Sequence, residues 1–446
     1  MFRILVMVFI ATLISGCSNI NQPNAEESVN SSTSPVSPSS QAPAPEPPEN
    51  RPALDESFLA AEANVCSLQE ARVEQRQPNN VGFPLSETWI PTLGTANFLV
   101  VPVTFSDIAS ENVPLDFIRD TAGKVSRWYA QTSRGKLEVK FDVIENWVEL
   151  NAPSTDFVFE KGKANVQTTN EDLIRNQLQA EMTESVIANL NDKSVLQGKD
   201  ALFMVFPQGA KAIKTSILQR GVDLPSTPEV ENLMVWGTGT DAPVRELEWA
   251  LWIHEALHDQ GLPLHAPGNG SDFGLGQNQY AKSSTLSGWE QFKLGWLSGD
   301  EVLCLDADKL DINGWHFNLG IFELPDSKPN VAILRLTDYE AIVIESRRPV
   351  GYSENYSNLH GAIVYKVDTR LDNDRASECC EDYGNDPEFD KWAYLIAPDD
   401  ISNSKQSTGG TSDKFIFEEG DEASIGDYIL RLQQSAELDS FTFARR

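Results

Sequence analysis

The hydrophobic pattern changes near residue 300, and this change constrains the fold more than any other feature. Before it, strand-like stretches alternate with stretches of helical spacing. Residues 95–107 are dense in β-branched and aromatic side chains, whereas residues 114–133 repeat apolar side chains at helical spacing. This alternation predicts a mixed α/β layer, in which helices cover a sheet.

Three further stretches continue this alternation. Residues 136–150 alternate like a strand, residues 171–192 form an amphipathic helical pattern, and residues 200–207 are typical of a buried strand. A helix is then expected from about Val244 to His258, because Gly261 after it readily adopts a left-handed cap conformation.

After Asp300 the helical spacing fades. Short alternating or apolar stretches, such as VAILRLTDYEAIVIESRR and HGAIVYKVDTR, are separated by Asp, Asn, Gly and Pro. This pattern predicts an all-β domain of the sandwich type over residues 301–446.

The first residues are typical of an export signal. Arg3 precedes an apolar run from Ile4 to Ile14, which is shorter than the roughly 20 residues that a membrane-spanning helix needs. The run leads into Ile-Ser-Gly-Cys, a pattern typical of bacterial lipoproteins, so residues 1–17 predict a signal peptide and a lipid anchor at Cys17. An ordinary cleaved signal is the alternative. The lipoprotein interpretation implies an outer membrane or cell-surface location.

Residues 18–54 are rich in Ser and Pro. They contain too few apolar side chains to form a core, which predicts a disordered linker. The whole chain has 66 acidic and 35 basic residues, a formal net charge of −31. A negative charge of this size repels the phosphate backbone of nucleic acids, which argues against a nucleic-acid partner.

Four cysteines remain after Cys17, at positions 66, 304, 379 and 380. An exported chain with four cysteines can form two disulfides, and the adjacent pair would most simply bond to different partners. Their spacing does not favour a metal site.

Three of the five histidines lie within residues 254–265, and His254, Glu255 and His258 form an HEXXH pattern. Residues four apart on a helix share a face, so the two histidines can bind one zinc ion. Glu255 is offset by one position, which suits a general base acting on a zinc-activated water during peptide hydrolysis. A chance helix with two surface histidines is the alternative.

The third zinc ligand is less constrained. The extended motif of zinc peptidases places it three residues after the glycine, but Leu264 occupies that position here. His265 follows one residue later and is the predicted third ligand, with Asp272 as the substitute.

The segment HEALHDQGLP, residues 254–263, resembles the immune inhibitor A-like secreted metallopeptidases of bacteria. LSGWEQFKLGWLS (286–298) is similar to their downstream Leu-Gly-Trp segment, and VVPVTFSD (100–107) with WYAQTSRGKLEV (128–139) is similar to their upstream block. The likeness covers about residues 95–370 and includes YEAIVIESRR and HGAIVYKVDTR.

This resemblance implies a metzincin-like zincin catalytic domain at residues 55–300, a zinc-dependent endopeptidase activity on protein or peptide substrates, and often bound calcium. The acidic run at 372–390 offers oxygen ligands for calcium, but it lacks the ordered spacing of an EF-hand loop, so a solvated loop held by disulfides is the favoured interpretation. The family's methionine below the metal is missing, and Leu275 or Gly276 takes its place.

Three alternatives accompany this interpretation. The chain could be a catalytically silent zincin-like adhesin, or an envelope lipoprotein with structural zinc. It could also be a latent enzyme in which a free Cys66 thiolate blocks the metal. A plain disulfide at Cys66 is the favoured interpretation over this latency. The sequence does not predict the cleavage preference or the oligomeric state.

Overall fold

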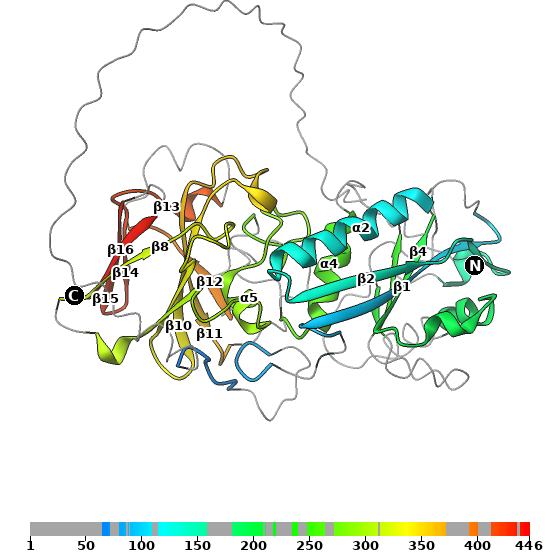
Figure 1. Ribbon diagram of the computed structural model, residues 1–446, viewed down its shortest axis with the longest axis horizontal. Helices are drawn as coiled ribbons and strands as arrows, with labels where there is room; N and C mark the ends of the chain where they lie inside the picture. Colours follow the sequence, from blue (N-terminus) through cyan, green and yellow to red (C-terminus); the bar gives the residue numbers. More distant parts are fainter. Residues whose placement is uncertain are drawn as a thin grey trace, which may run out of the picture. The chain divides into compact units, whose positions relative to one another are not determined.

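The computed structural model describes most of the chain from residue 65 onward (Figure 1). The described residues are 65–71, 80–85, 88, 90–108, 115–157, 181–207, 210, 217–219, 234–239, 248–263, 272–310, 313–371, 392–399, 412–434 and 438–446. The predicted signal peptide, Cys17 and the linker lie outside them. Residues 51–446 belong to one compact unit. No helix in the described ranges combines the length and the hydropathy needed to cross a membrane.

A six-stranded mixed sheet is built from the first half of this unit. Its strands are β1 (Gly94–Phe105), β2 (Leu137–Val143), β3 (Val148–Leu150), β4 (Ala201–Phe206), β5 (Ile217–Gln219) and β6 (Met234–Gly239). The order is β2-β1-β4-β6-β5, and β3 also pairs with β1. All these pairings are parallel except that of β5 with β6. The strands expected at 95–107 and 200–207 are confirmed, and the stretch expected at 136–150 forms two strands, β2 and β3, that pair with different parts of β1.

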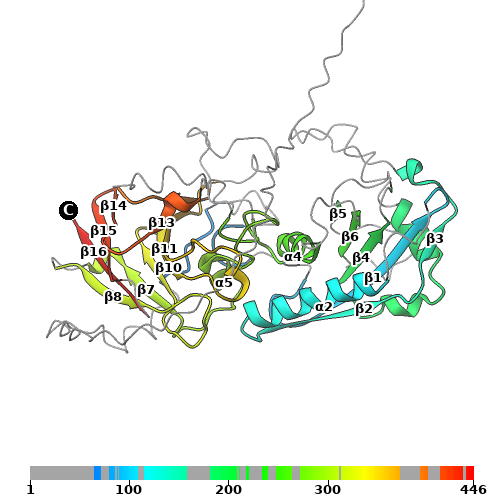
Figure 2. The same ribbon diagram turned by 90° about the horizontal axis from the view of Figure 1, so that it is seen from above.

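Both faces of this sheet are covered, as the nearly continuous apolar run of β1 requires. Phe98 and Val100 point into a core shared with α2 (Leu115–Thr132) and α4 (Glu248–Asp259). Leu99, Val101 and Val103 face a second core, which includes side chains of the helical residues 181–188. Figure 2 shows α2 and α4 on one side of the sheet. The predicted α/β layer is therefore present, although residues 171–180 of the expected helix are not described.

Helix α4 ends as its sequence predicts. Gly261 has a φ of 87°. Its N–H donates to the carbonyl of His258, and the N–H of Leu262 donates to the carbonyl of Leu257, both at 3.1 Å. These two bonds form a Schellman cap, which satisfies carbonyls that the helix itself cannot pair. The predicted start near Val244 lies outside the described residues.

The second half of the unit is almost entirely β structure, as predicted. One sheet has the order β12-β11-β10-β9-β7, with β13 paired to β11, and the other has the order β14-β15-β16-β8. The strands are β7 (Val302–Asp306), β8 (Trp315–Leu319), β9 (Val331–Arg335), β10 (Glu340–Arg347), β11 (Gly361–Asp368), β12 (Ala393–Ile396), β13 (Ile416–Phe417), β14 (Glu422–Ile425), β15 (Tyr428–Gln434) and β16 (Asp439–Arg445).

The two sheets pack against each other through a shared apolar core. Ile342 and Ile344 of β10 lie in one cluster with Leu430 of β15 and Phe443 of β16. The opposite face of β10 presents Val343 to a different cluster, which contains side chains of the short helix α5 (Gly288–Lys293). One sheet is thus buried on both faces, between the second sheet and α5.

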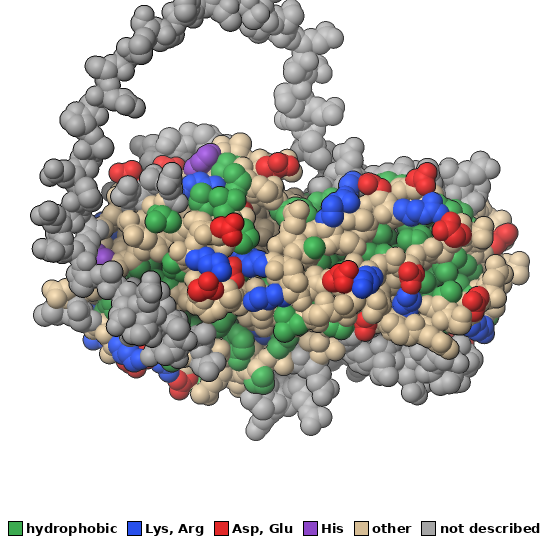
Figure 3. Space-filling model, in the orientation of Figure 1, with side chains coloured by type: hydrophobic (Ala, Val, Ile, Leu, Met, Phe, Trp, Pro, Cys, Tyr) green, Lys and Arg blue, Asp and Glu red, His purple; other side chains and the backbone are tan. Residues whose placement is uncertain are grey.

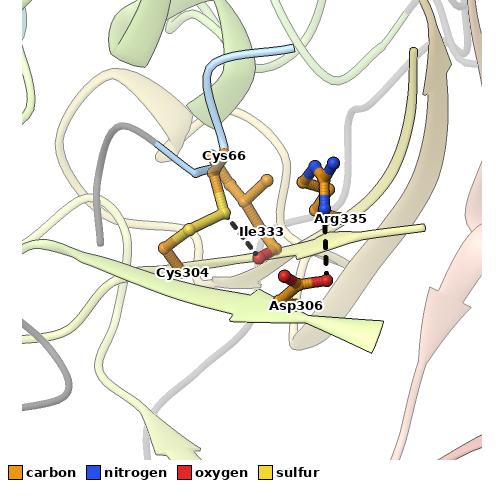
Figure 4. The surroundings of a disulfide bond; sticks show 5 residues. All are labelled: Cys66, Cys304, Asp306, Ile333 and Arg335. Carbon is orange, nitrogen blue, oxygen red and sulfur yellow. Dashed lines mark hydrogen bonds and ion pairs between the residues drawn. A yellow bond between two sulfur atoms is a disulfide. The ribbon is translucent and has the colours of Figure 1, made fainter. Parts of the chain in front are cut away.

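An N-terminal strap, residues 65–71 and 80–85, joins the core on the α5 side of the first of these sheets. Its residues Cys66, Leu68 and Val81 are buried in that core. Cys66 forms a disulfide with Cys304 of β7, beside the Arg335–Asp306 ion pair (Figure 4). The expectation of a plain disulfide at Cys66 is confirmed, and the alternative of a free Cys66 thiolate that blocks a metal is wrong. Cys379 and Cys380 lie outside the described residues.

Candidate metal centre

Helix α4 brings His254 and His258 together on one face. Their ring centroids are 5.3 Å apart and their planes make an angle of 86°. His254 is 3% exposed, and His258 is half-buried. A zinc ion about 2.0–2.1 Å from one nitrogen of each ring would lie roughly 3.2 Å from each ring centre, so tetrahedral bonding would separate the centres by about 5 Å. The observed spacing therefore fits two imidazoles on one ion.

The His254 ring is oriented by a backbone carbonyl. Its Nδ1 lies 2.6 Å from the carbonyl oxygen of Leu275. Because a carbonyl only accepts, Nδ1 must carry the hydrogen, and the lone pair of a neutral ring is then on Nε2. Metal-binding histidines are commonly held in this way, with the far nitrogen bonded to protein and the near one left for the ion.

Leu275 belongs to a support loop, residues 272–285, which passes beneath α4. The N–H of Leu275 donates to the carbonyl of Thr285 at 2.7 Å, and the N–H of Ser283 donates to that of Asp272 at 2.9 Å. The Leu275 side chain is fully buried in the core that contains Ile253 and Leu257 of α4. Leu275 thus occupies a packing position below the two histidines.

Glu255 follows His254 on α4 and is half-buried, whereas the apolar residues around it are buried. A side chain that reaches solvent from the edge of a buried helix can exchange a proton with a water molecule. Its position next to His254 is the one that the HEXXH pattern assigns to a proton acceptor.

The predicted third ligand cannot be placed, because Leu264 and His265 lie outside the described residues. The substitute, Asp272, forms an ion pair with Lys282 at 2.8 Å. In the described ranges, no three His, Cys, Asp or Glu side chains are grouped so as to hold a metal ion. The described part of the site therefore brings two imidazole side chains together, and a metal bound by them with His265 as third ligand stays a prediction.

No family model matches this chain. No match to a curated protein was found either. The resemblance to immune inhibitor A-like metallopeptidases therefore depends on the sequence motifs alone.

The acidic run, His316 and three tryptophans lie outside the histidine pair. The acidic run at 372–390, predicted as a solvated loop with calcium binding as the alternative, lies outside the described residues. Nδ1 of His316 lies 2.9 Å from the hydroxyl oxygen of Thr442, away from the histidine pair of α4 in the sequence. Trp128, Trp289 and Trp296 are buried in the cores of the compact unit.

A group of buried charges next to the support loop was not predicted from the sequence. Glu290 of α5 and Glu345 of β10 are 1% exposed, and Arg347 of β10 is equally buried. Burial raises the pKa of Glu290 to about 7 and also raises the pKa of Glu345. A signal for this group was present in the sequence, because Glu345 and Arg347 are charges two positions apart at the end of an apolar strand and must share one face.

Proposed function

We propose that this protein is an exported zinc-dependent endopeptidase, anchored to a membrane by a lipid at Cys17, that hydrolyses peptide bonds in protein substrates. The observation that carries the proposal is the pair of His254 and His258 on one face of α4, with Nδ1 of His254 bonded to the carbonyl of Leu275. The bond at Nδ1 places the lone pair of a neutral imidazole on Nε2, which is the nitrogen that would bind the metal.

His254 and His258 would hold the zinc ion, together with His265 as the third ligand. Zinc bound there would supply a Lewis acid that polarises the scissile carbonyl and lowers the pKa of a water molecule. Glu255 would accept a proton from the attacking water on its carboxylate and then release it to the leaving amine. The support loop would keep the His254 ring in its metal-binding tautomer during both transfers.

The fold is compatible with this function at a coarse level. A mixed sheet carries two helices on one face, and the second of them is the HEXXH helix with its glycine cap. A metzincin-like catalytic domain at residues 55–300, followed by a β domain at residues 301–446, is part of the proposal.

One observation favours a second candidate, a catalytically silent zincin-like adhesin. The residue three positions after Gly261 is Leu264, whose side chain cannot bind a metal. If His265 does not replace it, the site would bind zinc weakly, and the protein would use its β domain for binding alone.

Replacement of Glu255 by Gln separates the two candidates. We expect the wild-type protein to bind one zinc ion and to cleave members of a peptide library, and we expect Glu255→Gln to keep the zinc while hydrolysis falls by about 10²–10⁴-fold. The matched control is Glu138→Gln on the exposed side of β2, which should change neither property.

Two results would contradict the proposal. Stoichiometric zinc in a wild-type protein that cleaves no peptide of the library would remove the enzymatic part and favour the adhesin. Undiminished hydrolysis by Glu255→Gln would show that Glu255 is not the base.

A further inference from the structure

Strand β10 presents two charged side chains to the α5 side of its sheet. Ala341 and Val343 line this face with apolar side chains, and Glu345 and Arg347 continue it after them. Arg347 is 1% exposed, although an arginine is almost never fully buried unless it is paired. The groups that its guanidinium contacts therefore indicate the role of this buried charge.

Two carboxylates hold the guanidinium group of Arg347. Its Nε donates to Glu323 at 2.6 Å and its Nη1 donates to Glu345 at 2.9 Å. Glu345 in turn accepts hydrogen bonds from the Tyr365 hydroxyl, at 2.7 Å, and from the backbone N–H of Gly288 at the start of α5. Arg347 is thereby fixed in one orientation against the sheet and α5.

The remaining nitrogen of Arg347 reaches the support loop. Nη2 donates to the hydroxyl of Ser283 at 2.8 Å, and it lies 3.4 Å from the carbonyl oxygen of Phe273. These two residues are on the two sides of the loop, which are themselves joined by backbone hydrogen bonds next to Leu275. One guanidinium group thus contacts both sides of the loop whose Leu275 carbonyl orients His254.

We propose that Arg347 is a positioning residue for His254, acting through Ser283 and the support loop. Its contribution to metal binding rests on the proposed zinc function, whereas its contribution to the orientation of the His254 ring does not. The β sheet that carries Arg347 is then part of the metal centre, rather than a separate module.

A purely stabilising role explains these contacts less well. Buried ion pairs contribute little net stability compared with apolar side chains of similar size, because the charges lose their hydration. A network in which every member is bonded does, however, rigidify the groups that it contacts. Here the contacted group is the loop that holds the imidazole.

The decisive variant is Ser283→Ala, which removes the hydroxyl that Arg347 contacts and leaves the two ion pairs of Arg347 in place. The matched control is Ser346→Ala. Ser346 is as buried as Ser283 and adjoins Arg347, but its hydroxyl donates to Asp439 at 2.7 Å on the opposite face of the sheet. Replacing Arg347 itself would leave Glu323 and Glu345 without their cation, so that variant risks not folding.

Two quantities are measured in each protein. Long-range ¹H–¹⁵N NMR spectra of the metal-free protein report the tautomer of His254, assigned with a His254→Gln variant, and chelator competition reports the zinc dissociation constant. We expect the wild type and Ser346→Ala to show the Nδ1–H tautomer. In Ser283→Ala we expect a mixture of tautomers and a zinc affinity weaker by about threefold to tenfold. This loss is no larger than the roughly 10–100-fold loss that follows removal of a direct hydrogen-bond partner of a metal ligand, because Ser283 acts on His254 only through the loop.

An unchanged His254 tautomer in Ser283→Ala would overturn the proposal, whatever its zinc affinity. A tautomer change of the same size in Ser346→Ala would also overturn it, because the effect would then come from general loosening of the sheet. If the wild-type protein binds no zinc, the proposed function fails, and the tautomer comparison still tests the role of Arg347.

Discussion

Buried charges distinguish the region behind the support loop from an ordinary apolar core. Glu290 accepts hydrogen bonds from the backbone N–H and hydroxyl of Ser287 on Oε2, at 3.0 and 2.8 Å, and forms a capping box at the start of α5. Its Oε1 is buried and has no hydrogen-bond partner among the residues that the structure describes. Desolvation of this oxygen disfavours the charged form, which explains why the carboxyl group holds its proton to about neutral pH.

Glu290 is expected to make stability depend on pH. Its pKa rises from 4.5 to about 7 on folding, so the folded state binds more protons than the unfolded state between these values. The contribution of this group is therefore fully present below about pH 4.5 and is lost as the pH rises toward 7, by about 3 kcal/mol in total. Urea unfolding at pH 5 and pH 8 measures the change.

Glu290→Gln should reduce this pH dependence, because an amide does not ionise and its carbonyl can still accept the capping bonds. From pH 5 to pH 8, the wild type should therefore lose more unfolding free energy than the variant does. Glu138→Gln, at an exposed position, serves as the control. Equal pH dependence in the wild type and Glu290→Gln would contradict the assignment.

At the scale of the element, two glycines have opposite roles, one as the cap after a helix and the other inside a helix. Gly261 caps α4 with a left-handed backbone conformation, φ 87°. Gly123 lies inside α2, where an added Cβ would only come within 3.4 Å of the end of the flexible Arg127 side chain. The cap of α4 matters for the site because it ends the helix at Asp259, one residue after His258, a few positions before the predicted third ligand in the sequence.

Alanine substitutions at these two positions should therefore have opposite signs. Gly261→Ala should lower the free energy of unfolding by about 1–2 kcal/mol, because an L side chain is strained in the left-handed region. Gly123→Ala should raise it by roughly 0.5–1 kcal/mol, because alanine loses less entropy in a helix. Thermal or urea unfolding checks both. Destabilisation of similar size by both substitutions would argue against the cap.

At the scale of the whole molecule, contacts from distant parts of the sequence tie the compact unit together. The strap is covalently joined to β7 through Cys66–Cys304, across a sequence separation of 238 residues. Arg134, in the turn between α2 and β2, has a left-handed φ of 56° and forms a buried ion pair with Glu301 before β7. On the face shown in Figure 3, acidic and basic side chains lie next to each other rather than in separate patches, despite the net charge of −31.

Loss of the Cys66–Cys304 bond should lower the free energy of unfolding by about 2–5 kcal/mol, because the bond restricts a long loop in the unfolded chain. The double variant Cys66→Ala/Cys304→Ala tests this by urea unfolding under oxidising conditions. A reducing agent should lower the free energy of unfolding of the wild type. The double variant has no Cys66–Cys304 bond to reduce, so the same agent should bring the wild type close to the stability of the variant. Equal stability of the two proteins without reductant would contradict a structural role for the bond.

The sequence by itself determined the local structure around the site. The apolar spacing of residues 114–133 specifies α2, and the nearly continuous run of apolar side chains in residues 95–107 specifies a strand buried on both faces. Gly261 marks the end of α4 because few other residues adopt its backbone conformation without strain. The histidine spacing places both rings on one face of that helix because a helix repeats every 3.6 residues. Each of these properties depends on neighbours within a few positions.

Only the tertiary structure decided which distant residues meet. Nothing in the local pattern orders the strands as β2-β1-β4-β6-β5, chooses Cys304 as the partner of Cys66, or brings the carbonyl of Leu275 to Nδ1 of His254. Arg347 reaches the support loop from a strand more than sixty residues further along the chain. Such pairings depend on how whole faces pack, and the free energy of packing belongs to the assembled core rather than to any short segment.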